Sequence, residues 1–319
     1  MKWHTCSILL LCAIVCEAQV PLEPTDYAEK TLIAPAYFSP NAFPVPDMLD
    51  GSVSHDLRAE LAADGYYGFQ RDKTADLFAR IHIPLFTDRV NLTVWMPVVE
   101  FYHSTDERIS YCRVKEENQE KALRGHTAGD VYISTDIMFL REKERCPAMS
   151  VRAAVKTASG GGFHLARYYD SPGYFFDLSI GKSFPLTITG NQSPVTINRS
   201  PVTDNHPPVT IRLAASAGFL CWQTADGRQN DAVMYGALVR LQHRYFSIEE
   251  VFSGYVGWEN AGDRPMTLKT KLAGHIPAPK GKGSFSPFLM YQYGISDYPF
   301  HQLRLGLSYN IDILKKKDR

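Results

Sequence analysis

The feature that most constrains the fold is a two-residue alternation of apolar and polar side chains, which recurs along the chain and is clearest near its end. In "RLGLSYNI", residues 304–311, the large apolar side chains Leu305, Leu307, Tyr309 and Ile311 alternate with polar or small ones. Successive side chains of a strand point to opposite faces, so this segment would have one wholly apolar face. Such a face has to be covered by a second sheet or by lipid.

About twelve segments show this alternation, separated by turn or loop signals. Their polar faces carry charges of both signs, which suits an enclosed polar lumen, and aromatic residues gather at the segment ends. These two features favour an all-β fold, an antiparallel transmembrane β-barrel of about 12 strands, over a soluble sandwich. The segments are 56–70, 74–86, 89–102, 130–140, 149–158, 174–184, 209–224, 231–242, 247–259, 266–275, 284–294 and 301–311.

The connections between these segments differ in length in a way that also favours an outer-membrane barrel. Short links such as "TD", "EKER" and "HRYF" follow the second, fourth and eighth segments, and longer polar links follow several odd ones. Outer-membrane barrels have short periplasmic turns and longer outer loops. The link after the third segment, 103–129, is long enough for a short helix. A seven-residue unit repeated about three times, residues 193–213, breaks the pattern and reads as a duplication tolerated in a surface turn.

The predicted strand faces give a set of candidate lumen residues, all of them charged. The functional interpretation is a polar path for small solutes, and the alternative is a plug of ion pairs, because side chains can fill a narrow barrel. Small residues on the same faces, among them Ser134, Ala154, Ser179, Ala214 and Gly236, favour the open path. The candidates are Glu60, Asp76, Arg80, Glu100, Asp136, Arg152, Lys156, Asp177, Arg212, Arg240, Glu250, Lys269, Lys271 and Arg304.

The sequence divides into four regions. Residues 1–18 have the pattern of a cleaved secretory signal: Lys2, an apolar core and a small-x-small site before Gln19. Residues 19–54 are proline-rich, and we expect an extended periplasmic lead-in or a segment that enters the barrel as a plug. Residues 55–312 form the predicted barrel, and 313–319 a basic periplasmic tail.

The last strand carries a recognisable motif. Arg304, Gly306, Tyr309 and Ile311 are arranged as a polar residue, a glycine and two apolar positions, which resembles the C-terminal assembly signal of outer-membrane barrels. Together with the signal that ends before Gln19 and the "KTASGGG…ARYYDSPGYFFD" hairpin, the chain resembles Bacteroidetes-type outer-membrane β-barrel proteins. The resemblance implies a bacterial outer-membrane location, recognition by the barrel-assembly machinery, and contact with outer-membrane lipid and lipopolysaccharide.

These observations predict an integral outer-membrane barrel, most simply a narrow channel or transporter for small polar solutes. A closed structural barrel, a lipid-modifying hydrolase and a soluble periplasmic sandwich that binds a ligand remain as alternatives. We expect no enzymatic activity, because Ser159 and His164 share a loop without a visible orienting partner. Basic and acidic residues balance at 34 each, which implies no nucleic-acid partner. The cysteine spacing predicts no metal site, and we expect no cofactor.

Overall fold

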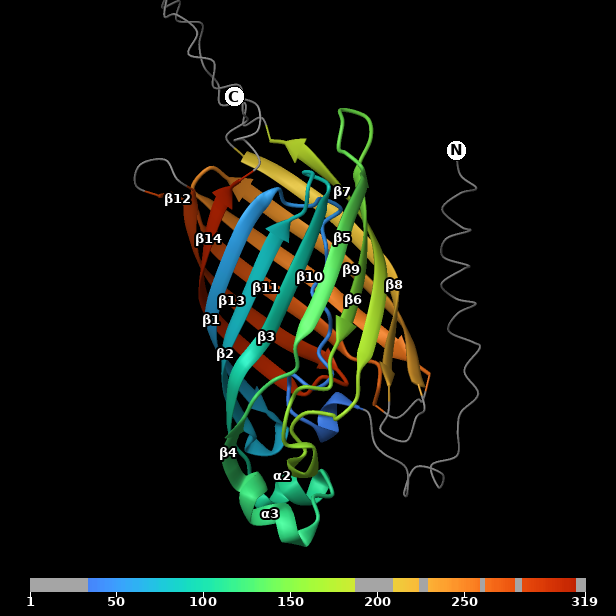
Figure 1. Cartoon of the computed structure of the whole chain (residues 1–319), viewed down its shortest axis with the longest axis vertical. Helices are drawn as coiled ribbons and strands as arrows, with labels where there is room; N and C mark the ends of the chain where they lie inside the picture. Colours follow the sequence, from blue (N-terminus) through green and yellow to red (C-terminus); the bar gives the residue numbers. More distant parts are fainter. Residues whose placement is uncertain (1–33, 187–208, 224–228, 259–261, 279–282, 314–319) are drawn as a thin grey trace, which may run out of the picture.

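The protein is a closed antiparallel β-barrel in the computed structural model, which describes residues 34–186, 209–223, 229–258, 262–278 and 283–313 (Figure 1). Twelve strands pair in sequence order, and the ring closes where β1 pairs with β14. The prediction of about twelve antiparallel strands is therefore confirmed. The barrel strands are β1 Asp56–Gly68, β2 Lys73–Pro84, β3 Val90–His103, β5 Tyr132–Leu140, β6 Ala148–Lys156, β7 Gly173–Pro185, β8 Val209–Gln223, β9 Gln229–His243, β10 Phe246–Gly257, β11 Met266–Gly274, β13 Ser284–Ser296 and β14 Phe300–Asp312.

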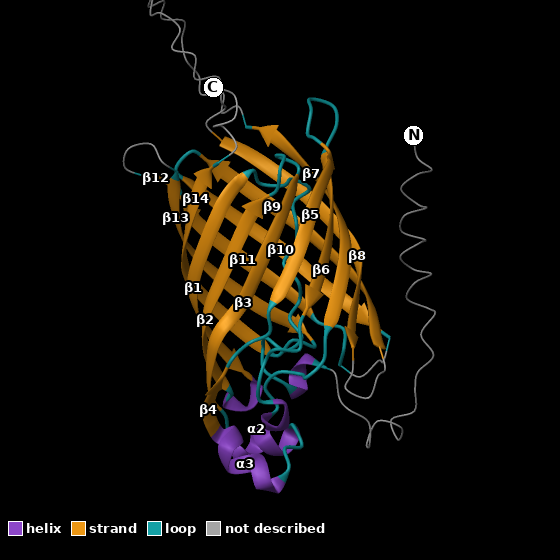
Figure 2. Ribbon diagram, viewed as in Figure 1, coloured by secondary structure: helices purple, strands orange, loops and turns teal. Residues whose placement is uncertain are grey.

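The short elements cluster at the two ends of the barrel (Figure 2). The end that carries the helices, here called the helical end, has α2 Asp106–Tyr111, α3 Glu116–Leu123, η3 Phe69–Arg71 and η4 Phe163–Leu165, and β4 Arg124–Thr127 pairs with the last residues of β3 there. The opposite end, the terminal end, is where β1 begins and β14 finishes, and β12 Ile276–Pro277 lies there. None of the helices within the described ranges has the length and apolar character of a transmembrane helix.

The outer face of the barrel is apolar. Every one of the twelve barrel strands exposes at least one large apolar side chain, for example Leu61, Ile137, Phe176, Leu268 and Leu305. The side chains between them face inward and are largely polar or charged. This distribution is the reverse of a water-soluble barrel, and it follows directly from the alternation in the sequence.

A stretch of chain ahead of β1, residues 34–54, runs inside the barrel, and we call it the lumenal segment (Figure 1). It begins with the 3-10 turn η2 Pro35–Tyr37 at the helical end, where Arg108 donates to the Ala36 and Phe38 carbonyls. It leaves at the terminal end, where β1 starts. Its described part thus traverses the lumen from one end to the other. Residues 193–208 of the predicted repeat and 314–319 of the predicted tail lie outside the described residues, as do the predicted signal, 1–18, and the lead-in as far as residue 33. The last residues of the repeat, 209–213, begin β8.

Two glycines allow the lumenal segment to pass close to the wall. Gly51 adopts a left-handed φ of +82°, and a Cβ there would lie 2.5 Å from the Gly181 nitrogen of β7. A Cβ on Gly181 would in turn overlap the Asp50 carbonyl oxygen. Only glycine permits both the backbone conformation and this approach.

Candidate functional site: the barrel lumen

The structure places thirteen of the fourteen charged lumen candidates inside the barrel. Most are buried against the lumenal segment or against each other, whereas Arg80, Arg240, Lys271 and Arg304 keep part of their surface open to an internal cavity. The buried ones are Glu60, Asp76, Glu100, Asp136, Arg152, Lys156, Asp177, Arg212 and Lys269.

Glu250 is the exception, and the prediction that it faces the lumen is wrong. On β10 the inward positions are held by Glu249, Val251 and Ser253, so Glu250 points outward and accepts a hydrogen bond from Thr270 Oγ1 at 3.0 Å. Two adjacent glutamates make the parity of this strand ambiguous in the sequence. Ile248 and Phe252 face outward in the structure, which places Glu250 on the outer face and Glu249 on the inner one. Glu249 pairs with Arg240 inside the barrel.

A buried polar cluster closes the lumen near the helical end. The Glu100 carboxylate of β3 is completely buried and accepts from Arg167 Nε at 2.9 Å and from the Tyr168 hydroxyl at 3.0 Å. Asn41 of the lumenal segment donates to Glu100 at 3.0 Å and to Asp76 at 2.7 Å. The 157–172 loop, the barrel wall and the lumenal segment are therefore joined through one carboxylate.

The loop groups in this cluster keep their ordinary protonation states. Burial by itself would lower the pKa of Arg167, but the adjacent Glu100 carboxylate and then Asp72 raise it overall. Burial, followed by the charge of Glu100, raises the pKa of Tyr168 well above its usual value. Arg167 therefore stays charged, and Tyr168 stays a hydrogen-bond donor, throughout the physiological pH range.

Aromatic side chains fill the lumen beside this cluster. Phe38 and Phe43 of the lumenal segment pack against Tyr169 of the loop and Trp222 of β8, with ring centroids 5.2–6.1 Å apart. The Tyr255 ring of β10 lies edge-on to Trp222, with ring centroids 6.5 Å apart, and its hydroxyl donates to the Phe43 carbonyl at 3.4 Å. This apolar layer and the cluster around Glu100 together hold the lumenal segment near the helical end.

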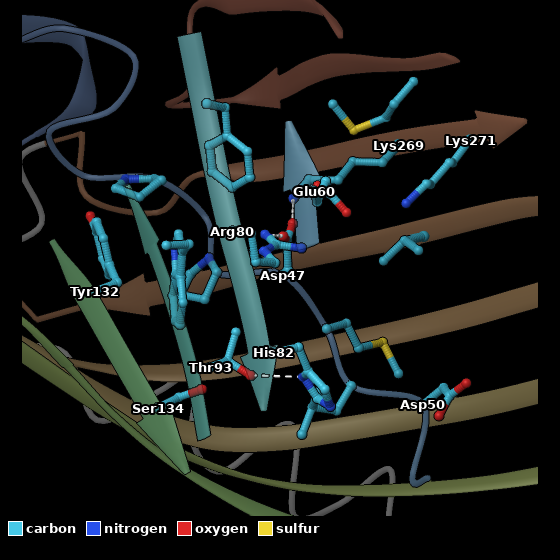
Figure 3. Close-up of a pocket in the computed structure, with 18 of the residues that line it drawn as sticks. Asp47, Asp50, Glu60, Arg80, His82, Thr93, Tyr132, Ser134, Lys269 and Lys271 are labelled. Carbon is cyan, nitrogen blue, oxygen red and sulfur yellow. Dashed lines mark hydrogen bonds and ion pairs between the residues drawn. The ribbon is translucent and has the colours of Figure 1, made fainter. Parts of the chain in front are cut away.

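Farther along the lumen, the segment is held by ion pairs to the wall. The Asp47 carboxylate lies 2.7 Å from both Arg80 and Lys269 (Figure 3). The Asp50 carboxylate lies 2.6 Å from Arg240 and 3.2 Å from Arg212. These two acidic residues, three positions apart, bind four cationic side chains on four different strands.

Arg152, near the middle of β6, also binds both the wall and the lumenal segment. Its Nε donates to Asp177 Oδ2 at 3.0 Å, and an Nη2 donates to the Asp47 carbonyl at 2.7 Å. Asp136 lies directly opposite on the neighbouring strand β5. Arg152 thus joins β6 and β7 to the lumenal segment.

A cavity of about 630 Å³ remains beside the segment, lined by charged and polar side chains together with apolar ones such as Phe78, Trp95 and Phe288 (Figure 3). His82 projects into it and contacts Thr93 Oγ1 at 2.9 Å and Asn91 at 2.8 Å. Sequence reasoning missed Asn41, Asp47 and Asp50, although the run "PVPDMLDG" contains two of them. A proline-rich lead-in gives no periodicity by which to predict its partners.

The four motif residues of the predicted assembly strand, β14, lie on the faces that the alternation predicts. Arg304 and Gly306 face inward, and Tyr309 and Ile311 lie on the outward side of β14. Arg304 pairs with Asp64, with Nε 2.6 Å from Oδ1. A Cβ on Gly306 would come within 2.3 Å of the Phe288 ring and 2.8 Å of Ala62, so the glycine makes room for an inward aromatic residue. Recognition of this strand by assembly machinery stays a prediction.

The loop residues considered for hydrolysis are not brought together. Ser159 Oγ lies 2.8 Å from the Thr157 hydroxyl, whereas His164 packs edge-on against Phe163. Among the residues that the structure describes, no group of three or more histidine, cysteine or acidic side chains is placed to hold a metal ion.

Comparisons with known proteins find matches among solved structures, and those named here have low sequence identity to this chain. No family model and no curated protein matches the chain. Solved structures that match include the NanC porin (10% identity, 78% of this chain and 98% of that one, TM-score 0.41) and LpxR from Salmonella typhimurium (10%, 79% and 99%, 0.41). The translocator domain of the autotransporter NalP from Neisseria meningitidis also matches (9%, 82% and 91%, 0.40). At these values the comparisons assign no function to this chain.

Proposed function

We propose that this protein is an integral outer-membrane β-barrel that serves as a narrow channel for small polar solutes, with the lumenal segment as its gate. The apolar outer face supports insertion in a lipid bilayer, where a closed barrel satisfies all backbone hydrogen bonds. The cavity of about 630 Å³ inside the charged wall supports passage of polar solutes. This cavity is the observation that carries the proposal.

The second candidate is a closed structural barrel. Glu100 and Arg167 are buried and paired, and Arg152 is paired to Asp177, as expected of a lumen filled by its own ion pairs. The two candidates differ in whether the lumenal segment ever leaves the wall. In a channel the ion pairs between the lumenal segment and the wall have to break, whereas in a structural barrel they stay formed.

A reversible covalent bond between the segment and the wall separates the two candidates. A Cβ built on Gly236 of β9 would lie 2.8 Å from Met48 Sδ and 3.3 Å from its Cγ. Cysteines at these two positions are close enough for a disulfide. We expect the Met48→Cys/Gly236→Cys variant, with exposed Cys146 replaced by serine, to show single-channel openings in planar bilayers only when reduced.

The matched control is Met48→Cys alone, whose conductance should not respond to oxidation. Silence of the parent and of the reduced variant at all voltages would instead establish the closed structural barrel. Openings that persist after the disulfide forms would show that solutes pass without movement of the lumenal segment.

A further inference from the structure

The wall of the lumenal cavity carries more positive than negative charge. Seven cationic side chains of the barrel wall line it, against the acidic Glu60, Asp136 and Glu249. Two further carboxylates in the lining, Asp47 and Asp50, belong to the lumenal segment. The segment therefore brings in part of the negative charge that the wall lacks.

Several of the wall cations have acidic partners on the wall itself. Arg304 pairs with Asp64, Arg152 with Asp177, and Arg240 with Glu249. These pairs would persist if the lumenal segment moved away. They supply no free positive charge to a solute.

Arg80 and Lys269 differ from these cations. Among the described residues, the carboxylate within ion-pair distance of each is that of Asp47, at 2.7 Å in both cases. They come from β2 and β11, which are separated in the barrel by β1, β14 and β13, and they converge on one group (Figure 3). The Arg80 guanidinium also lies over the Phe78 ring, 5.0 Å from its centroid, which holds it in a fixed orientation.

The contact between Asp47 and these cations borders on open space. The Asp47 side chain keeps 48% of its surface accessible although the barrel encloses it, because it projects into the cavity. Lys271 lines the same cavity, and its ammonium lies 4.2 Å from the centre of the Phe288 ring. An anion larger than a carboxylate therefore has room beside Arg80 and Lys269.

We propose that Arg80 and Lys269 form an anion-binding site for solutes that bear a carboxylate or phosphate group, and that Asp47 occupies it as an internal ligand while the lumenal segment is in place. A guanidinium binds two oxygens of such a group, and an ammonium adds a compact charge. The role of this site in selecting solutes rests on the proposed channel function, whereas binding at the site does not.

Chemical rescue of a missing carboxylate tests the site directly. Asp47→Ala removes the internal ligand and leaves both cations in place. We expect sodium acetate and inorganic phosphate to raise the melting temperature of the refolded variant above its value in equal sodium chloride, because an anion that binds the folded state stabilises it. Asp47→Ser is the second variant if Asp47→Ala does not refold.

Two controls make this result specific. Asp88→Ala removes the carboxylate of an exposed pair with Arg141 at the terminal end, and it should gain nothing from acetate or phosphate. Asp47→Ala combined with Arg80→Gln and Lys269→Gln should lose the rescue. Absence of rescue in Asp47→Ala and Asp47→Ser, or equal rescue in Asp88→Ala, would overturn the proposal.

Ion selectivity connects the site to transport. In a potassium chloride gradient, the reversal potential of Asp47→Ala should lie closer to the equilibrium potential of chloride than to that of potassium. Arg80→Gln/Lys269→Gln in the same background should shift the reversal potential toward the equilibrium potential of potassium. An open channel that is cation-selective in Asp47→Ala contradicts the inference and leaves the channel function standing. Rescue by acetate without any conductance supports the anion site and contradicts the channel function.

Discussion

Replacing Arg167 with methionine is expected to lower the free energy of unfolding by about 3–5 kcal/mol, the cost of leaving a buried charge without its partner. Arg167 provides the guanidinium that neutralises Glu100, which has no exposed surface. Tyr168 and Asn41 donate hydrogen bonds to the same carboxylate but carry no charge. Urea titration of the refolded barrel, followed by tryptophan fluorescence, measures the loss.

A double variant separates the missing charge from the missing packing. Arg167→Met leaves two buried carboxylates without this cation, Glu100 and the more distant Asp72 at 3.8 Å. Glu100→Gln in the Arg167→Met background removes the nearer of the two charges and keeps an acceptor for Tyr168, so it should regain part of the stability. The control is Arg141→Met, which breaks an ion pair with both side chains nearly half exposed and should cost under about 1 kcal/mol. Equal losses for Arg167→Met and Arg141→Met would show that the buried cluster does not stabilise the barrel.

The fold could be predicted from the sequence because the alternation of apolar and polar residues recurs in every strand. Each strand has one face against an apolar surrounding and one against a polar interior, and a slip of one residue would reverse both. Where apolar residues mark one face clearly, as in β14, the predicted parity agrees with the structure. Where two charges are adjacent, as at Glu249 and Glu250, the polar pattern alone does not fix the parity.

The contents of the lumen could be predicted only in part. All the charged candidates except Glu250 lie inside, but part of their pairing depends on the lumenal segment, which has no periodic pattern. Small wall residues such as Gly236 favoured an open path in the sequence. In the structure Gly236 makes room for Met48, and Gly181 for the Asp50 backbone. Space left by small side chains inside a barrel is thus space for another part of the chain as well as for solute.

The assignment of a gate, rather than a permanent plug, depends on how strongly the segment is held at each end. At the helical end it is fixed by buried contacts, with Phe43 packed against Trp222 and Asn41 bonded to Glu100. Around Asp47 it borders a cavity and is held by ion pairs. Ion pairs beside open space are weakened by water and salt, whereas buried packing is not. The ion-paired half is therefore the part we expect to move first.

The second large effect concerns the outer face. Leu305 lies near the middle of β14, points outward and is 65% exposed. If lipid covers this face, Leu305→Arg places a charge near the centre of the bilayer and should destabilise the barrel by about 2–4 kcal/mol. Reversible unfolding from phosphatidylcholine vesicles measures this difference.

Depth within the bilayer provides the matched comparison on the same strand. His301 also points outward on β14 but lies at its helical end, one residue after the strand begins. His301→Arg should therefore cost only about 0–1 kcal/mol, because a cationic side chain near the interface reaches water. A water-exposed outer face makes the opposite prediction, since Leu305→Arg would then replace an exposed leucine by a well-solvated charge at little cost. Equal and small effects at the two positions would contradict the membrane location, whereas a steep difference between them would measure how deeply β14 lies in lipid.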